Sequence, residues 1–152
     1  MDRSDNDAPR ARGAPPPCPQ PRRVLRTGTY LHTSCPLCRA EIVEGDWIHF
    51  RAIAPDGALG DLRLSARFNV FDQESTIALG AGDQVRDLAC PRCGVSLLDA
   101  KLRCAQCGAA AVRIRVAAVR TELDLLLCSR YGCHWHDVPE EDRQRLVLEQ
   151  GP

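Results

Sequence analysis

The chain has 152 residues and balanced charge, with 20 Lys and Arg residues against 20 Asp and Glu residues. This balance disfavours a general nucleic-acid coat or a protein that binds anionic membranes, because both classes normally carry a basic surplus. Aromatic residues make up only 5% of the chain, so the core must be aliphatic and thin. Small domains with thin cores usually need disulfides or a metal.

The N-terminal region, residues 1–26, is rich in Pro, Arg and Asp and has almost nothing to bury. Its stretch GAPPPCPQPRR predicts an extended, disordered arm. The arm has no apolar segment typical of a signal peptide, and no apolar run in the chain reaches the length of a membrane span. We therefore expect a cytoplasmic protein with no membrane association. Cys18 has no ligand-like spacing from another cysteine and is interpreted as a free thiol without a role.

Residues 27–137 are predicted to form a β-rich domain. The segments 46–54 and 61–71 alternate apolar and polar residues, and the Asp56–Gly57 pair between them favours a tight turn. These features predict a hairpin. Further along, AAVRIRVAAVR places Val112, Ile114 and Val116 on one face, which indicates a half-buried strand, and ELDLLLCSR is interpreted as its neighbour.

Residues 138–152 are predicted to form a short helix and a tail. Asp137 is placed as an N-cap, Glu140 follows three residues later, and Gly151 lies past the expected end. The predicted fold class is therefore mainly β, with a disordered N-terminal arm and a short C-terminal helix.

Eight of the nine cysteines occur as four pairs, three of them with C-x-x-C spacing. A C-x-x-C turn directs two sulfurs at one point, and a tetrahedral metal ion needs two such turns facing each other. In a reducing compartment such pairs more often bind metal than form disulfides. The predicted metal ligands are Cys35, Cys38, Cys90, Cys93, Cys104, Cys107, Cys128 and Cys133.

The stretch CPRCGVSLLDAKLRCAQCG, residues 90–108, resembles the two knuckles of a zinc ribbon or of a rubredoxin-like module. Glycine follows the second cysteine of each knuckle, where it lets the chain turn tightly. The resemblance implies a metal-binding ribbon at residues 88–110, with a short hairpin, VSLLDAKLR, between the knuckles. It implies no particular function, because zinc ribbons occur in proteins with many different functions.

Two pairings of the cysteines are open. We favour a nested one, in which the ribbon forms one site and the outer pairs, Cys35–Cys38 and Cys128–Cys133, form a second. The alternative joins each knuckle to its neighbour along the chain. Two zinc ions are expected, with iron as a less favoured metal, because four sulfurs accept either.

Two histidines follow the last cysteine and leave the composition of the outer site open. His136 could replace a cysteine as a ligand. We favour the interpretation that His134 and His136 lie at the surface or beside the site while Trp135 packs over the knuckle, because a closed four-thiolate site needs no imidazole.

No nucleotide-binding or metalloprotease motif occurs in the sequence, so no catalytic or cofactor-binding residue is predicted, and a non-enzymatic role is favoured. The leading hypothesis is a zinc-binding accessory or structural protein, in which two four-cysteine sites staple a β-rich domain that mediates protein–protein interaction in a larger assembly. One alternative is a zinc ribbon that binds nucleic acid with the help of the arginines of the arm, which is not favoured. The other is a rubredoxin-like iron or thiol redox protein.

Overall fold

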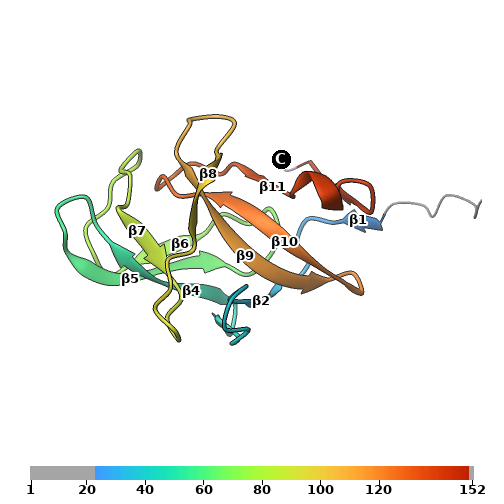
Figure 1. The fold of residues 1–152 in the computed structure, drawn as a ribbon, viewed down its shortest axis with the longest axis horizontal. Helices are drawn as coiled ribbons and strands as arrows, with labels where there is room; N and C mark the ends of the chain where they lie inside the picture. The colour runs from blue at the N-terminus through green and yellow to red at the C-terminus, as the bar shows by residue number, and fades with distance from the viewer. Residues whose placement is uncertain (1–22, 151–152) are drawn as a thin grey trace, which may run out of the picture.

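The computed structural model describes residues 23–150, and their fold is mainly β, as predicted (Figure 1). Most of the predicted arm, including Cys18, lies outside the described residues. The strands are β1 (Arg23–Leu25), β2 (His32–Ser34), β3 (Val43–Glu44), β4 (Trp47–Ile53), β5 (Leu59–Ser65), β6 (Gln73–Ser75), β7 (Asp87–Ala89), β8 (Leu98–Arg103), β9 (Ala110–Ala118), β10 (Thr121–Cys128), β11 (His136–Asp137) and β12 (Leu146–Leu148), and a 3-10 turn, η2 (Glu140–Asp142), precedes β12.

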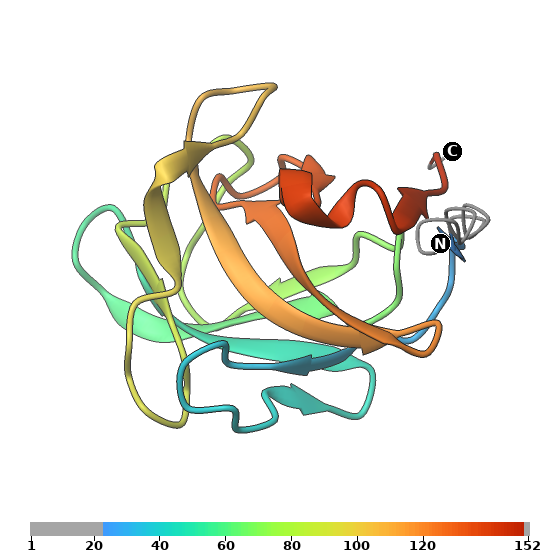
Figure 2. The same cartoon turned by 45° about the vertical axis from the view of Figure 1, so that its right-hand side comes forward.

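The strands form two five-stranded sheets and one two-stranded sheet. The first large sheet has the order β11-β10-β9-β2, with β8 also paired to β9. The second has the order β3-β4-β5-β6, with β7 also paired to β4. Figure 2 shows the orange strands β9 and β10 lying across from the green and teal strands β4 and β5. Side chains of both sheets, such as Phe50 and Ile114, belong to one apolar core.

The predicted hairpin is confirmed as β4 and β5, whose register runs from Trp47 opposite Ser65 to Ile53 opposite Leu59. Alternation in β4 puts Phe50 in the core with no exposed surface, because successive side chains of a strand point to opposite faces. The strand pair predicted after Cys107 is also confirmed, as β9 and β10.

The turn between β9 and β10 has an uncommon backbone. The register places Thr121 opposite Ala118, which leaves two residues, Val119 and Arg120, to make the turn. Their φ angles are 46° and 62°, as a type I′ turn requires. Such turns favour Asn and Gly, and a β-branched residue in this conformation is strained.

The predicted C-terminal helix is wrong. Between residues 138 and 150 only η2 is helical, and its N-cap residue, Pro139, makes no side-chain capping hydrogen bond. The carboxylate of Asp137 instead accepts hydrogen bonds from the backbone N–H of Val138 and from Arg143. The chain then extends as β12, because alternation buries Leu146 and exposes Val147.

Strand β12 pairs in parallel with β1, from Arg23 opposite Leu146 to Leu25 opposite Leu148. Leu25 has no exposed surface, so the apolar side chains of this small sheet complete the core. Both strands lie outside the predicted domain boundaries of 27 and 137, and β1 lies within the end of the predicted arm. Among residues 23–150 there is no helix long and apolar enough to cross a membrane.

Candidate metal centres

The structure gathers the eight predicted cysteines into two groups of four, and the sulfur atoms of each group lie within 4.8 Å of one another. The favoured nested pairing is wrong, because each knuckle faces its neighbour along the chain. We call the two groups site 1 and site 2. Site 1 consists of Cys35, Cys38, Cys90 and Cys93, and site 2 consists of Cys104, Cys107, Cys128 and Cys133.

The path of the chain between residues 93 and 104 explains the correction. The predicted ribbon requires a hairpin here, but residues 98–103 form one strand, β8, which pairs with β9 and has a register shift between Asp99 and Arg103. Leu97 is buried in the core at the start of this strand. The strand therefore carries Cys104 away from Cys93, and in Figure 1 the two knuckles lie at opposite ends of the segment that contains β8. The single ribbon at residues 88–110 is not formed.

The three C-x-x-C knuckles share one backbone structure. In each, the sulfur of the first cysteine accepts hydrogen bonds from the backbone N–H groups two and three residues later, at 3.3–3.4 Å. The carbonyl of the same cysteine accepts a bond from the N–H four residues later, at 2.9–3.0 Å. These N–H groups orient the sulfur and stabilise its negative charge.

The residue that donates its N–H to the carbonyl of the first cysteine has a positive φ in all three C-x-x-C knuckles. Gly94 and Gly108 have φ angles of 77° and 81°, which confirms that the glycines allow the turn. In the first knuckle the same position is held by Arg39, with a φ of 66°. A residue with a Cβ is disfavoured in this conformation, so the first knuckle carries local strain that the other two avoid.

The fourth knuckle is longer and is closed differently. The sulfur of Cys128 accepts one bond, from the N–H of Arg130 at 3.3 Å. The N–H of Cys133 donates to the carbonyl of Arg130, and the N–H of Cys128 donates to the carbonyl of Trp135 at 3.1 Å. Gly132 has a φ of 87° and makes the reversal before the second cysteine.

The spacing of the sulfurs fits a tetrahedral ion. A zinc ion about 2.3 Å from each of four sulfurs places the sulfurs about 3.8 Å apart. The closest pairs across site 1 are 3.9 and 3.8 Å apart, and those across site 2 are 3.7 and 3.4 Å apart. Disulfide sulfurs are about 2.05 Å apart, and all eight cysteines are free. Both groups could therefore hold metal ions, and the four sulfurs accept either zinc or iron.

In site 2 the protein favours one thiolate. The backbone N–H of Ala109, together with the guanidinium of Arg130, lowers the pKa of Cys107 to about 6. Burial raises the pKa of Cys128. Cys107 therefore ionises more readily than Cys128, and a metal ion would displace the remaining protons of the site.

Site 1 has the same asymmetry. Burial opposes ionisation of Cys90, but the backbone N–H groups of Cys93 and Arg92 outweigh it and lower the pKa of Cys90 to about 7. The N–H of Ala40 lowers the pKa of Cys38, but burial and the neighbouring thiols raise it to about 11. Cys90 thus ionises more readily than Cys38.

The two histidines are not part of either group of four. The ring of His134 stacks on Phe71, with centroids 4.3 Å apart and planes 4° apart. His136 donates from Nδ1 to the carbonyl of His134 at 3.0 Å and packs edge-on against Phe68, with centroids 5.0 Å apart. The structure therefore places both imidazoles beside site 2 and does not use His136 as a replacement ligand.

The two sites occupy different places in the fold. Site 1 lies where the chain passes between the large sheets, after β2 of one sheet and after β7 of the other. Its buried ligands, Cys35 and Cys90, have no exposed surface and belong to the core. Site 2 joins the ends of β8 and β10, two strands of one sheet. The ligands of site 1 therefore come from strand ends in two different sheets, whereas those of site 2 come from strand ends in a single sheet.

Arginines of the strands are paired with acidic side chains. Arg113 and Arg115 share the carboxylate of Asp124, at 2.7 and 3.1 Å. Arg63 lies 3.5 Å from Glu74 in the other sheet. These pairs offset the charge of three strand arginines.

Comparison with family models, with curated proteins and with solved structures found no match for this chain. The resemblance to zinc ribbons therefore rests on the spacing of the cysteines and on the geometry of their sulfurs.

Proposed function

We propose that this protein is a non-enzymatic zinc-binding scaffold, in which two zinc ions staple a β-rich domain that mediates protein–protein interaction as part of a larger assembly. The observation that carries the proposal is the presence of two groups of four cysteines whose sulfurs have the separation of a tetrahedron around zinc.

The composition of each group favours a structural ion over a catalytic one. Catalytic zinc normally keeps one position for water or substrate, whereas structural zinc is enclosed by four protein ligands. Each group here supplies four sulfurs within 4.8 Å of one another. Cys35, Cys90 and Cys104 are buried, with at most 3% of each residue exposed, and Cys35 and Cys90 belong to the apolar core. A metal at these positions would compensate for the thin aliphatic core.

The interaction role is supported by the surface next to site 2. Val70 and Phe71 are 36% and 37% exposed and lie together in the loop between β5 and β6. Contiguous exposed apolar side chains are typical of protein-binding surfaces. The charge balance of the chain and the paired strand arginines favour a protein partner over nucleic acid.

Metal analysis tests the scaffold. The untagged protein, expressed without added metal and purified without chelator, is expected to contain two zinc ions per chain by elemental analysis. Cys18→Ser is the matched control, because Cys18 has no predicted role and the variant should keep both ions. One ion or none in the folded wild-type chain, or iron in place of zinc with absorbance in the visible range, would contradict the proposed zinc scaffold.

A photo-crosslinking residue tests the interaction role. Placed at Val70, it is expected to yield one discrete cross-linked partner. The matched control is the same residue at Leu59, which is 71% exposed in the β4–β5 turn. Identical products from both positions, or none from position 70, would count against an interaction through this surface.

A further inference from the structure

The two sites differ in how firmly the fold holds their cysteines. Among the residues that the structure describes, the apolar core includes Cys35 and Cys90 of site 1 but no cysteine of site 2. Because protein cores are close-packed, a displacement of either core sulfur would disturb the packing of the whole domain. The ligands of site 2 lie instead at strand ends of a single sheet. Site 2 can therefore rearrange at a lower cost in stability than site 1.

Cys107 is the ligand of site 2 that solvent reaches most readily. It is exposed, whereas Cys104 is buried and Cys128 and Cys133 are half-buried. The guanidinium of Arg130 interacts with the sulfur of Cys107. Exposed and electropositive surroundings of this kind are typical of reactive cysteines, which attack as thiolates. Cys107 therefore has the environment of a cysteine that reacts first with an external oxidant.

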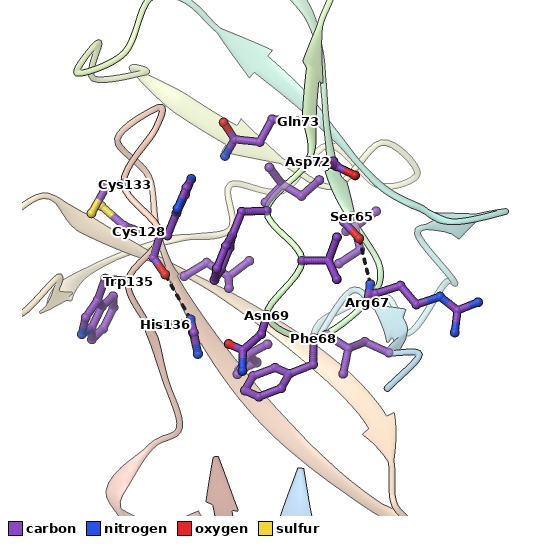
Figure 3. A pocket seen from close by; sticks show the side chains of 18 residues that line it. Ser65, Arg67, Phe68, Asn69, Asp72, Gln73, Cys128, Cys133, Trp135 and His136 are labelled. Carbon is purple, nitrogen blue, oxygen red and sulfur yellow. Dashed lines mark hydrogen bonds between the residues drawn. The ribbon is translucent and has the colours of Figure 1, made fainter. Parts of the chain in front are cut away.

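A second sulfur lies directly beside that of Cys107. The sulfur of Cys128 is 3.4 Å away, the shortest separation among the facing pairs of the two sites. It accepts one backbone N–H bond, whereas the first sulfur of each C-x-x-C knuckle accepts two. Figure 3 shows Cys128 close to Cys133, the other cysteine of the same knuckle. A disulfide bond of about 2.05 Å requires the sulfurs of Cys107 and Cys128 to approach by about 1.4 Å.

We propose that site 2 is a modification site for hydrogen peroxide, which oxidises Cys107 and Cys128 to a disulfide and leaves site 1 intact. This inference rests on the proposed zinc scaffold and adds a regulated loss of one of its two ions. Structural zinc is held by four protein ligands, so an ion at site 2 would lose two of them to the disulfide and would be released. An accessible cysteine with a second cysteine beside it is typical of reversible thiol oxidation.

The reaction has two steps, and both sulfurs begin as thiolates because cysteine ligands of a metal are deprotonated. In the first step the sulfur of Cys107 attacks one oxygen of hydrogen peroxide, the O–O bond breaks, and a sulfenic acid and a hydroxide ion form. In the second step the sulfur of Cys128 attacks the sulfur of the sulfenic acid, the S–S bond forms, and a second hydroxide ion leaves. The two sulfurs give up two electrons in all, and one peroxide molecule is reduced to two hydroxide ions.

The test is stepwise oxidation of the full chain with both zinc ions bound. The Cys18→Ser variant is used, because Cys18 is the one cysteine that belongs to neither site. Zinc released by hydrogen peroxide is measured with a colorimetric chelator. We expect one ion per chain to leave at a peroxide concentration about tenfold lower than the other. Dithiothreitol added together with zinc should restore both ions.

Peptide mapping identifies the cysteines that have reacted. After release of the first ion, the chain is denatured, alkylated and analysed by mass spectrometry without reduction. Cys107 should be linked to Cys128, and all four cysteines of site 1 should be recovered as alkylated thiols. This measurement leaves both sites unaltered in sequence, so it does not depend on the folding of a ligand variant.

Two arginine variants test the surroundings of Cys107. Arg130→Met removes the guanidinium beside the sulfur and should slow release of the first ion about threefold or more, with both ions bound before oxidation. Arg92→Met is the matched control, because Arg92 is an exposed residue in a knuckle of site 1. It should leave the rate of release from site 2 unchanged.

Four results would overturn the proposal: release of both ions at one peroxide concentration, earlier oxidation of site 1, a site 2 disulfide between other cysteines, or an unchanged rate in Arg130→Met. Zinc content is measured before peroxide is added. A chain that begins with two ions and gives one of these results refutes the modification site and leaves the zinc scaffold standing. A chain that begins without zinc contradicts the scaffold and this inference together.

Discussion

The unequal placement of the two sites predicts unequal consequences of losing one ligand from each. The matched changes are Cys93→Ser in site 1 and Cys107→Ser in site 2. Both cysteines are exposed, so neither change leaves a cavity in the core. Each variant should retain one zinc ion, at the site left intact.

The loss of stability expected for each variant depends on which segments of the chain its missing ion would join. The facing cysteines Cys38 and Cys90 of site 1 are 52 positions apart, and Cys107 and Cys128 of site 2 are 21 apart. On the loop-entropy scale used for cross-links, closing these loops is worth about 4 and about 3 kcal/mol. That difference, about 0.8 kcal/mol, is small. The larger difference in stability between the two variants comes from sheet packing, because only the ligands of site 1 come from both large sheets.

Loss of the site 1 ion should therefore unfold the packing between the sheets. Structural zinc contributes about 10 kcal/mol or more of apparent binding free energy, comparable with the whole stability of a small domain, about 5–15 kcal/mol. Cys93→Ser is expected to lose amide protection throughout β4 and β5. Cys107→Ser is expected to lose it only near residues 104–108 and 128–135, because β9 and the second sheet keep their other contacts.

Hydrogen exchange measured by mass spectrometry, with metal content on the same samples, distinguishes the two patterns. The reasoning would be refuted if Cys93→Ser kept the protection of β4 and β5. It would also be refuted if Cys107→Ser lost protection throughout the domain, since site 2 would then hold more than one sheet.

Three further predictions concern the backbone. Replacing the β9–β10 turn, Val119→Asn with Arg120→Gly, should raise the free energy of unfolding by about 1–2 kcal/mol, because both residues have positive φ; an unchanged denaturant midpoint would show that the turn is not strained. Arg39→Gly should stabilise the protein by about 1 kcal/mol, because Arg39 also has a positive φ, and both zinc ions should be retained. Weaker zinc binding would instead assign the arginine a role at the metal. Gly60→Ala should lower the thermal unfolding midpoint, because the added Cβ would lie 2.5 Å from Cγ2 of Ile77. The expected cost is about 1–3 kcal/mol, and an unchanged midpoint would contradict this close approach.

Local features of the sequence determined the strands and the ligands. Alternation over residues 46–54 and 110–118 predicts half-buried strands because a strand exposes its two faces in turn. The C-x-x-C spacing predicts sulfur pairs because the turn brings both cysteines together and holds the sulfur of the first through its own N–H groups. Asp56–Gly57 marks the turn between β4 and β5 for a similar local reason. Each of these predictions needs only a few neighbouring residues.

The C-terminal segment shows where local signals mislead. Asp137 and the acidic residues 140–142 resemble the start of a helix, and only the 3-10 turn η2 forms. Leu146 instead pairs beside Arg23, 123 positions away. No local pattern contains that pairing, because β1 and β12 bury their leucines only when both ends of the chain reach the same part of the core.

The pairing of the knuckles was decided by the tertiary structure. The spacing of the cysteines shows which eight of them lie in pairs, but a turn orients only its own two sulfurs and carries no information about the pair that faces it. That choice depends on β8, which pairs with β9 and separates the knuckle at Cys93 from the one at Cys104. Once this strand pairs with β9, the knuckle after β7 meets the one after β2, and the knuckle after β8 meets the one at the end of β10. The physical reason is that sheet pairing, a long-range interaction, places the ends of the strands from which the sulfurs project.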